Sequence, residues 1–153
     1  MCLVLGDFDQ GWELFESRWT VAELGNQQRY AQLPQWLGQE SISGKSILLY
    51  NEQGLGDTLQ FCRYVPQLQA MGAKVSLAVQ APLVSLLSGQ WPDVTVAESF
   101  TDLSEFDLAT PLMSLPLALG TTLETIPADV PYIRVPASPP PIAHDRLRVG
   151  FVW

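Results

Sequence analysis

Aromatic residues recur at every third or fourth position near the start of the chain, which predicts an amphipathic helix within residues 1–20. A turn with an acidic cap, Gly6-Asp7, comes just before this pattern. The helix is too short to be stable alone, so we expect its aromatic face to pack against the rest of the protein. The aromatic positions are Phe8, Trp12, Phe15 and Trp19.

From residue 46 the pattern changes to short apolar runs that alternate with helical periodicity. Pro66 lies inside the first predicted helix and should kink it or loosen one turn, and Gly72 ends it. Strands joined by helices of this length imply right-handed crossovers and a parallel sheet covered on both faces, so the fold class is α/β, Rossmann-like. The predicted strands are 46–50, 74–79, 94–96 and 106–109, the helices are 58–71, 82–87 and 114–119, and residues 131–135 are extended.

The sequence divides into three parts. Residues 1–36 are a helical segment and connector, which Trp36 should pin to the body, and residues 37–135 form the Rossmann-like domain. Residues 136–153 begin with a stiff proline-rich spacer and end in an apolar run with the pattern of a buried strand. That run either joins the existing sheet or pairs with a neighbouring chain, which would give a homo-oligomer.

The composition argues against several classes of function. The 153 residues carry a net charge of −8, and 47% of them are hydrophobic. Such an acidic domain is unsuited to nonspecific binding of nucleic acid or of anionic lipid. Two cysteines and a single histidine do not make a metal site, and no cofactor is indicated. No apolar run is long enough for a membrane span and no signal peptide is recognised, so we expect a cytoplasmic protein.

A glycine-rich loop at residues 51–57 follows the first strand, as phosphate-binding loops do. A dinucleotide fingerprint would need a glycine where Leu59 stands and an acid near Gln80, and no Gly-Lys-Ser/Thr motif follows. Asp57 stands where the helix is predicted to begin. A carboxylate ~4 Å from a phosphate charge would cost roughly 1–4 kcal/mol. The loop therefore favours a positioned base over a phosphate site, and the alternative is that Asp57 only caps the helix.

Three segments should line a crevice beyond the carboxyl ends of the strands, where open parallel sheets bind ligands. They are residues 51–57, 80–82 and 110–114. Asp57 is the candidate catalytic residue. Ser114 is also a candidate helix cap, and Lys45 and Arg63 are expected to be solvated or to pair with local acids such as Glu52. The candidate substrate-binding residues are Gln53, Gly54, Leu55, Gly56, Gln80 and Ser114.

An ordered set of motifs carries a resemblance to a known family. The motifs are residues 34–36, 44–45, 51–64, 82–87, 111–127, 131–133 and 148–153. Together they resemble bacterial proteins in which tetratricopeptide repeats precede a domain similar to the heptosyltransferase family (glycosyltransferase family 9), which has the two-lobed GT-B fold. The resemblance implies that residues 1–20 are a repeat remnant, and that Asp57, with Gly54 and Gly56, matches the loop whose aspartate deprotonates the acceptor hydroxyl.

The resemblance implies a function for the chain as a whole. It would be the acceptor-side lobe of a glycosyltransferase, which binds a sugar or glycan acceptor, and a nucleotide-sugar only if a second lobe is supplied. Since the chain stops at Trp153, we expect a fragment without activity of its own. The alternatives are a protein–protein interaction module, which assembles through the aromatic helix face and the terminal strand, and a small nucleotide-binding protein.

Overall fold

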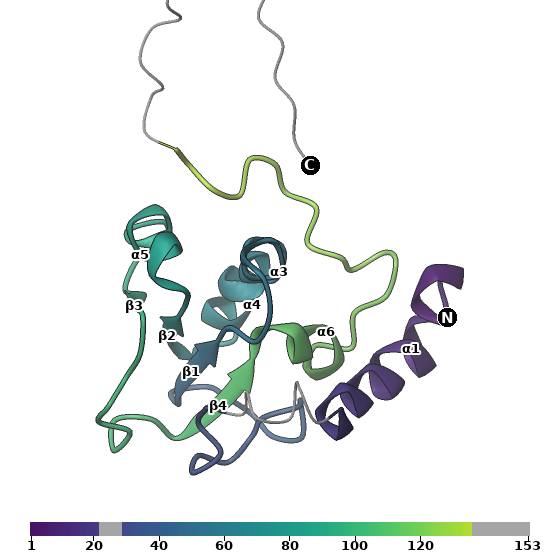
Figure 1. The fold of residues 1–153 in the computed structure, drawn as a ribbon, viewed down its shortest axis with the longest axis horizontal. Coiled ribbons are helices and arrows are strands. Elements are labelled where there is room, and N and C mark those ends of the chain that lie inside the picture. The colour runs from purple at the N-terminus through teal and green to yellow at the C-terminus, as the bar shows by residue number, and fades with distance from the viewer. Residues whose placement is uncertain (22–28, 136–153) are drawn as a thin grey trace, which may run out of the picture.

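The computed structural model describes residues 1–21 and 29–135. Its centre is a parallel sheet in the order β3-β2-β1-β4 (Figure 1). The α/β class with a parallel sheet and flanking helices, predicted from the sequence, is confirmed. The strands are β1 (Ser46–Tyr50), β2 (Lys74–Ala78), β3 (Thr95–Ala97) and β4 (Leu108–Pro111).

The two faces of the sheet are covered differently. Alternate residues of β1 point to opposite faces, with Ile47 and Leu49 in one core and Leu48 and Tyr50 in the other. Helices α3 (Leu55–Phe61), α4 (Val65–Ala70) and α5 (Ala81–Leu87) cover the first face. The second face is covered by the connection from β3 to β4, through Phe100, Leu103 and Phe106, and by Tyr30 and Leu33. The described cover of that face is therefore irregular chain, where helices were expected.

The helix predicted at residues 58–71 begins earlier and is interrupted. Helix α3 begins at Leu55, and a 3₁₀ turn at Cys62–Tyr64 separates it from α4. Pro66 occupies the first turn of α4. Because proline has no N–H for the residue 62 carbonyl, a continuous helix would lose a hydrogen bond here, and the predicted loosening is confirmed. Gly72 follows α4 with φ of +86°, in the left-handed region that favours glycine.

The amino-terminal segment packs onto the sheet domain. Helix α1 (Phe8–Phe15) lies between 3₁₀ turns at Leu3–Leu5 and Glu16–Thr20, and the Asp7 carboxylate accepts a hydrogen bond from the Gln10 amide at 3.3 Å. The predicted acidic cap is thus confirmed. Trp12 and Phe15 pack against the main core, and α1 contacts the short helix α6 (Leu115–Ala118). The aromatic face is therefore used, at least in part, inside the molecule.

The connector before β1 is held against the sheet. Trp36 is 1% exposed, its amide donates to the Ala109 carbonyl at 3.1 Å, and the Ala109 amide donates to the Pro34 carbonyl at 3.0 Å. This confirms that Trp36 pins the connector, which lies beside β4. Residues 131–135 form no strand, but the Gln90 side-chain amide is hydrogen-bonded to both the amide and the carbonyl of Arg134.

The predicted proline-rich spacer and terminal strand, residues 136–153, lie outside the described residues. Within the described residues, no helix is long and apolar enough to cross a bilayer.

Candidate functional site

The carboxyl ends of three strands meet at one edge of the sheet, because β1 lies between β2 and β4. The three segments predicted as crevice walls come together there. The Gln80 side chain donates to the Gln53 carbonyl at 2.8 Å, and the Met113 amide donates to the Glu52 carboxylate at 3.1 Å. The strand order reverses between β1 and β4, where open α/β sheets place their ligand crevice.

A buried arginine from the amino-terminal segment lies beyond the carboxyl ends of β1 and β4, against residues that follow these two strands. Arg18 is 7% exposed, and its Nε and Nη2 donate to the two oxygens of Glu52 at 2.8 and 3.1 Å. Its Nη2 also donates to the Ser114 hydroxyl at 2.6 Å. Ser114 is fully buried, and its hydroxyl donates to Glu16 at 2.9 Å. The protein therefore occupies the switch point with its own side chains, which we call the Arg18 cluster (Glu16, Arg18, Glu52 and Ser114).

Burial and charge oppose each other within the Arg18 cluster. Burial lowers the pKa of Arg18, but the hydrogen bonds and charges of Glu52 and Glu16 outweigh it, so the pKa of the guanidinium is raised. Burial raises the pKa of Glu52, and the Arg18 guanidinium and the Met113 amide act in the opposite direction. A bidentate pair of this kind is costly to break from one side, because the remaining charge is left buried.

Sequence reasoning missed Arg18 and expected a nearer partner for Glu52. In the structure Lys45 pairs with Glu40 at 2.6 Å, and Arg63 donates to the Pro127 carbonyl at 3.0 Å. One feature of the sequence indicates that Arg18 is buried. It follows Phe15 by three positions, which places its positive charge on the same helix face as the aromatic residues that pack against the core. Its guanidinium carbon is 4.8 Å from the centre of the Phe15 ring.

On the β1–β2 side of the same edge, Asp57 lies in the first turn of α3. Gly54, in an extended conformation, is the N-cap, so Asp57 is the third helical residue and caps the helix from that position rather than as the N-cap. Its Oδ2 accepts a hydrogen bond from the Gly54 amide at 2.9 Å. The carboxylate thus reaches back over the turn, as the acidic residue of a capping box does. The side chain is half-buried.

The loop beside Asp57 is open. A Cβ built on Gly56 meets nothing within 4 Å, whereas one on Gly54 would lie 3.3 Å from Asp57 Oδ2. Neither glycine has a positive φ, so no left-handed backbone conformation requires glycine at either position. Leu55 is 45% exposed. The chain here presents backbone and an acid to solvent.

The remaining candidates divide between the two sides. Gln80 accepts a hydrogen bond from the Thr58 hydroxyl at 2.9 Å and donates to the Gln53 carbonyl, so it holds the loop to the start of the next helix. The structure therefore brings residues 53–57 and Gln80 together on the β1–β2 side. Ser114 lies on the other side, within the Arg18 cluster. Their roles in binding substrate stay predictions.

Among the described residues, no group of three or more His, Cys, Asp and Glu side chains is placed to hold a metal ion.

Comparison with known proteins corrects the expected family. No family model and no solved structure matches the chain. Protein FlbA of Caulobacter vibrioides is 38% identical over 99 residues, which are 61% of this chain and 16% of FlbA. The prediction that the chain belongs to the heptosyltransferase family and carries a tetratricopeptide repeat is therefore wrong, because the similarity found is a partial one to FlbA. The chain matches less than a fifth of that protein's length.

Proposed function

We propose that the β1–β2 side of the carboxyl edge binds the acceptor of a sugar-transfer reaction, and that Asp57 is the general base for the acceptor hydroxyl. The hydrogen bond from the Gly54 amide uses one carboxylate oxygen, Oδ2. A carboxylate has about four acceptor positions, so Asp57 keeps the capacity to accept from a substrate hydroxyl. General bases have to lie within hydrogen-bond reach of the proton that they remove, and the partly exposed Asp57 carboxylate is accessible to an acceptor hydroxyl at this edge.

Gly56 is the observation that carries this proposal. Glycine inside a helix costs roughly 0.5–1 kcal/mol relative to alanine. At Gly56 neither a positive φ nor a close neighbour requires glycine. A ligand that approaches the backbone beside Asp57 would explain it, because a side chain at position 56 would occupy that space.

A hydroxyl-bearing ligand suits this edge better than a phosphate. The Asp57 carboxylate lies over the first turn of α3, where an anion would otherwise be attracted by free amides and the helix dipole. A second negative charge ~4 Å away would be opposed by roughly 1–4 kcal/mol. A neutral sugar meets no such repulsion and can donate its hydroxyl proton to the carboxylate.

The rest of the reaction is also part of the proposal. The nucleotide-sugar donor would bind only if a second lobe is supplied. The name FlbA says nothing about a reaction, and the match covers 16% of that protein, so it lends no support to sugar transfer. We further propose a cytoplasmic location, since Cys62 is a buried free thiol and Cys2 is unpaired, as is usual in a reducing compartment.

A titration followed by nuclear magnetic resonance tests acceptor binding. The full chain, labelled with ¹⁵N, is titrated separately with glucose, mannose and pyrophosphate. We expect the sugars to shift the amide resonances of Gly54 and Gly56 and pyrophosphate to leave them unmoved. If no sugar moves these resonances, or if pyrophosphate moves them, acceptor binding at this edge is wrong.

The base is tested separately by Asp57→Asn, which keeps the shape of the side chain and can still accept from Gly54. The assay uses a preparation in which the chain is combined with a donor-binding lobe and sugar transfer is detectable. There we expect Asp57→Asn to lower kcat by a factor of about 10²–10⁴, while the sugar still binds. Glu98→Gln removes one exposed carboxylate elsewhere and is the matched control. If Asp57→Asn leaves kcat unchanged, Asp57 is not the general base, but the proposal that sugars bind at this edge is unaffected.

A protein–protein interaction module is the second candidate. The sequence analysis suggested assembly through the aromatic helix face and the terminal strand. Trp12 and Phe15 of that face pack against the core, and the terminal strand lies outside the described residues, so these two features do not support the module. What favours it is a groove that remains open beside α1.

A further inference from the structure

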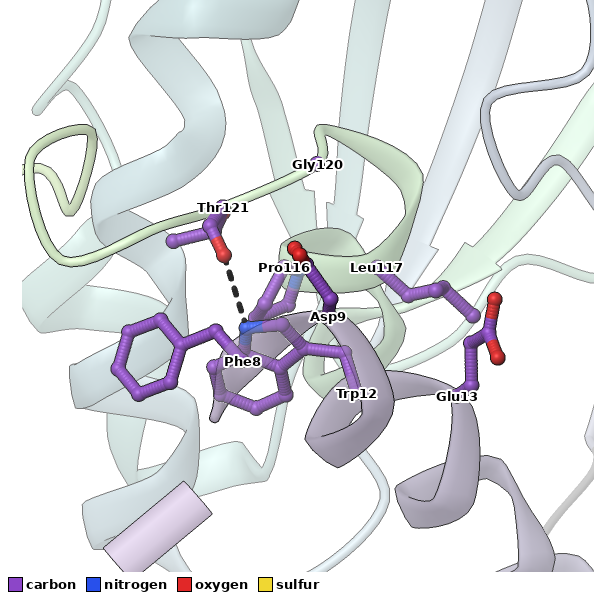
Figure 2. A pocket seen from close by; sticks show the side chains of 8 residues that line it. All are labelled: Phe8, Asp9, Trp12, Glu13, Pro116, Leu117, Gly120 and Thr121. Atoms are coloured by element: carbon purple, nitrogen blue, oxygen red, sulfur yellow. Dashed lines mark hydrogen bonds between the residues drawn. The ribbon is translucent and has the colours of Figure 1, made fainter. Parts of the chain in front are cut away.

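A groove of about 300 Å³ runs between α1 and α6 (Figure 2). Its floor is apolar and held in place. The Trp12 indole donates to the Thr121 carbonyl at 3.1 Å, and the Phe8 ring lies 5.5 Å from the Trp12 ring at an angle of 59°. The lining residues are Phe8, Asp9, Trp12, Glu13, Pro116, Leu117, Gly120 and Thr121.

Two acids stand on the rim of this groove. Asp9 and Glu13 are four residues apart, which places them on the same side of α1, and both are exposed. Figure 2 shows both acids on α1, and they line the same groove as Pro116 and Leu117 of α6. The ion pairs among the described residues involve neither acid. Both carboxylates are therefore available to a positive charge that enters from outside.

We propose that this groove docks a segment of a partner protein in which basic side chains alternate with apolar ones. An arginine of that segment would pair with Asp9 or Glu13, because a guanidinium matches a carboxylate in two parallel hydrogen bonds. Its apolar neighbours would lie on Pro116 and Leu117.

Charge complementarity selects this partner. The chain has a net charge of −8, so it attracts basic partners at long range and repels nucleic acids and anionic membranes. The two rim acids add a short-range element, which fixes where the basic segment binds. The groove has no residue in common with residues 53–57 and Gln80, so this inference stands independently of the acceptor-binding proposal.

Two peptides and two double variants of the full chain test it. The first peptide is a capped pentapeptide of alternating leucine and arginine, and its match has glutamate in place of arginine. We expect the arginine peptide to shift the indole N–H resonance of Trp12 and the glutamate peptide to leave it unmoved. Asp9→Asn combined with Glu13→Gln should weaken binding about tenfold by calorimetry, because it removes both rim charges that would pair with the arginines.

Glu98→Gln combined with Glu105→Gln is the matched control, because it removes the same charge from two exposed positions outside the groove. It should change the affinity by less than about twofold. For the unmodified chain, the Trp12 shift caused by the arginine peptide should fade at high salt, which tests the charge even if a variant folds poorly.

Three results would overturn the inference. The glutamate peptide could bind as tightly as the arginine peptide, or both double variants could weaken binding equally, which would leave only the overall charge as the cause. Alternatively, light scattering could show a dimer that Asp9→Asn with Glu13→Gln disrupts, in which case a second copy of the chain occupies the groove.

Discussion

Two acids that follow β1 closely in the sequence have different environments. Glu52 is 7% exposed and gives both oxygens to Arg18 and one of them also to the Met113 amide. Asp57, five residues later, is half-buried and accepts one hydrogen bond from Gly54. The first acid closes the β1–β4 side of the sheet edge, and the second faces the open β1–β2 side.

This difference shows how the amino-terminal segment shapes the site. Strand order alone would place a ligand beyond the carboxyl ends of β1 and β4, and Arg18 occupies that position. The open side, with Gly56 beside the carboxylate, is where we propose that a ligand binds. The helical segment 1–20 is therefore part of the architecture of the edge, and the following changes test the contrast from the largest expected effect to the smallest.

Arg18→Met should lower the free energy of unfolding by about 3–5 kcal/mol, because it leaves the Glu52 charge buried without its partner. The measurement is urea denaturation of the full chain. Lys74→Met, at an exposed position, is the control and should lie within about 0.5 kcal/mol of the unmodified protein. A loss equal to that of the control would mean that the Arg18 cluster does not hold the edge.

The double variant Arg18→Met with Glu52→Leu should be more stable than Arg18→Met alone, since neither buried charge remains. If the losses from the two single variants simply add, the two residues are not coupled, and the structural role given to Glu52 fails.

The inner side of the 3₁₀ turn at Cys62–Tyr64 should be protected from reagents that modify exposed residues. Burial raises the pKa of Cys62 from 9.0 to about 12, so its thiolate fraction should be lower by about a thousandfold. We expect iodoacetamide at neutral pH to label Cys2, which is half-exposed, long before Cys62. Mass spectrometry of the digested protein gives both rates. Equal rates would show that the inner side is accessible.

The same thiol predicts a pH effect with a defined sign. Its pKa is higher in the folded than in the unfolded protein, so the folded state keeps the proton between pH 9 and about pH 12 while the unfolded state loses it. The contribution of Cys62 to stability is fully present below pH 9 and is lost as the pH rises through this window. Denaturation of Cys62→Ala across the same pH range should lack this part of the decline.

Asp57→Ala should cost about 1 kcal/mol of stability, since it removes the hydrogen bond to Gly54 and a favourable charge in the first turn. Asp57→Asn should cost less, because its side-chain oxygen can still accept from the Gly54 amide. Urea denaturation measures both. A loss from Asp57→Ala as large as that from Arg18→Met would give Asp57 the same structural role as Glu52 and would erase the contrast between the two acids.

Gly56→Ala should stabilise the protein by roughly 0.5–1 kcal/mol, because the position is helical and open. Gly72→Ala is the matched control and should destabilise, since Gly72 has a φ of +86° and a Cβ there would approach the Ser43 hydroxyl at 3.0 Å. If Gly56→Ala stabilises the fold and weakens binding of the sugars, glycine at position 56 serves the ligand. Unchanged sugar binding would argue against that role.

Local patterns predicted much of the fold. The strand at 46–50 was predicted with its observed bounds, since an apolar run between polar residues defines a buried strand without any tertiary information. The interruption near Pro66 was predictable for the same reason, because the missing N–H is a property of the residue itself. The start of α3 was misplaced by three residues, since Gly54 carries no side chain that would mark it as an N-cap.

The candidate site was predictable only in part. The meeting of the loops after β1, β2 and β4 follows from a parallel sheet, and the structure shows it. The resemblance to a heptosyltransferase was wrong, although it rested on motifs in a plausible order, and FlbA is the similarity that was found. The division of the loop into a closed and an open side was not predictable, because Arg18 lies 34 residues before Glu52 and no local rule connects them.

By itself the sequence determined which segments become strands and helices, and that Asp57 would lie at the carboxyl end of the first strand, because periodicity and backbone preference are local. Only the tertiary structure decided which acid is buried. Burial of a charge depends on a partner delivered from elsewhere in the chain, and Arg18 reaches Glu52 only because α1 packs against α6 at that edge.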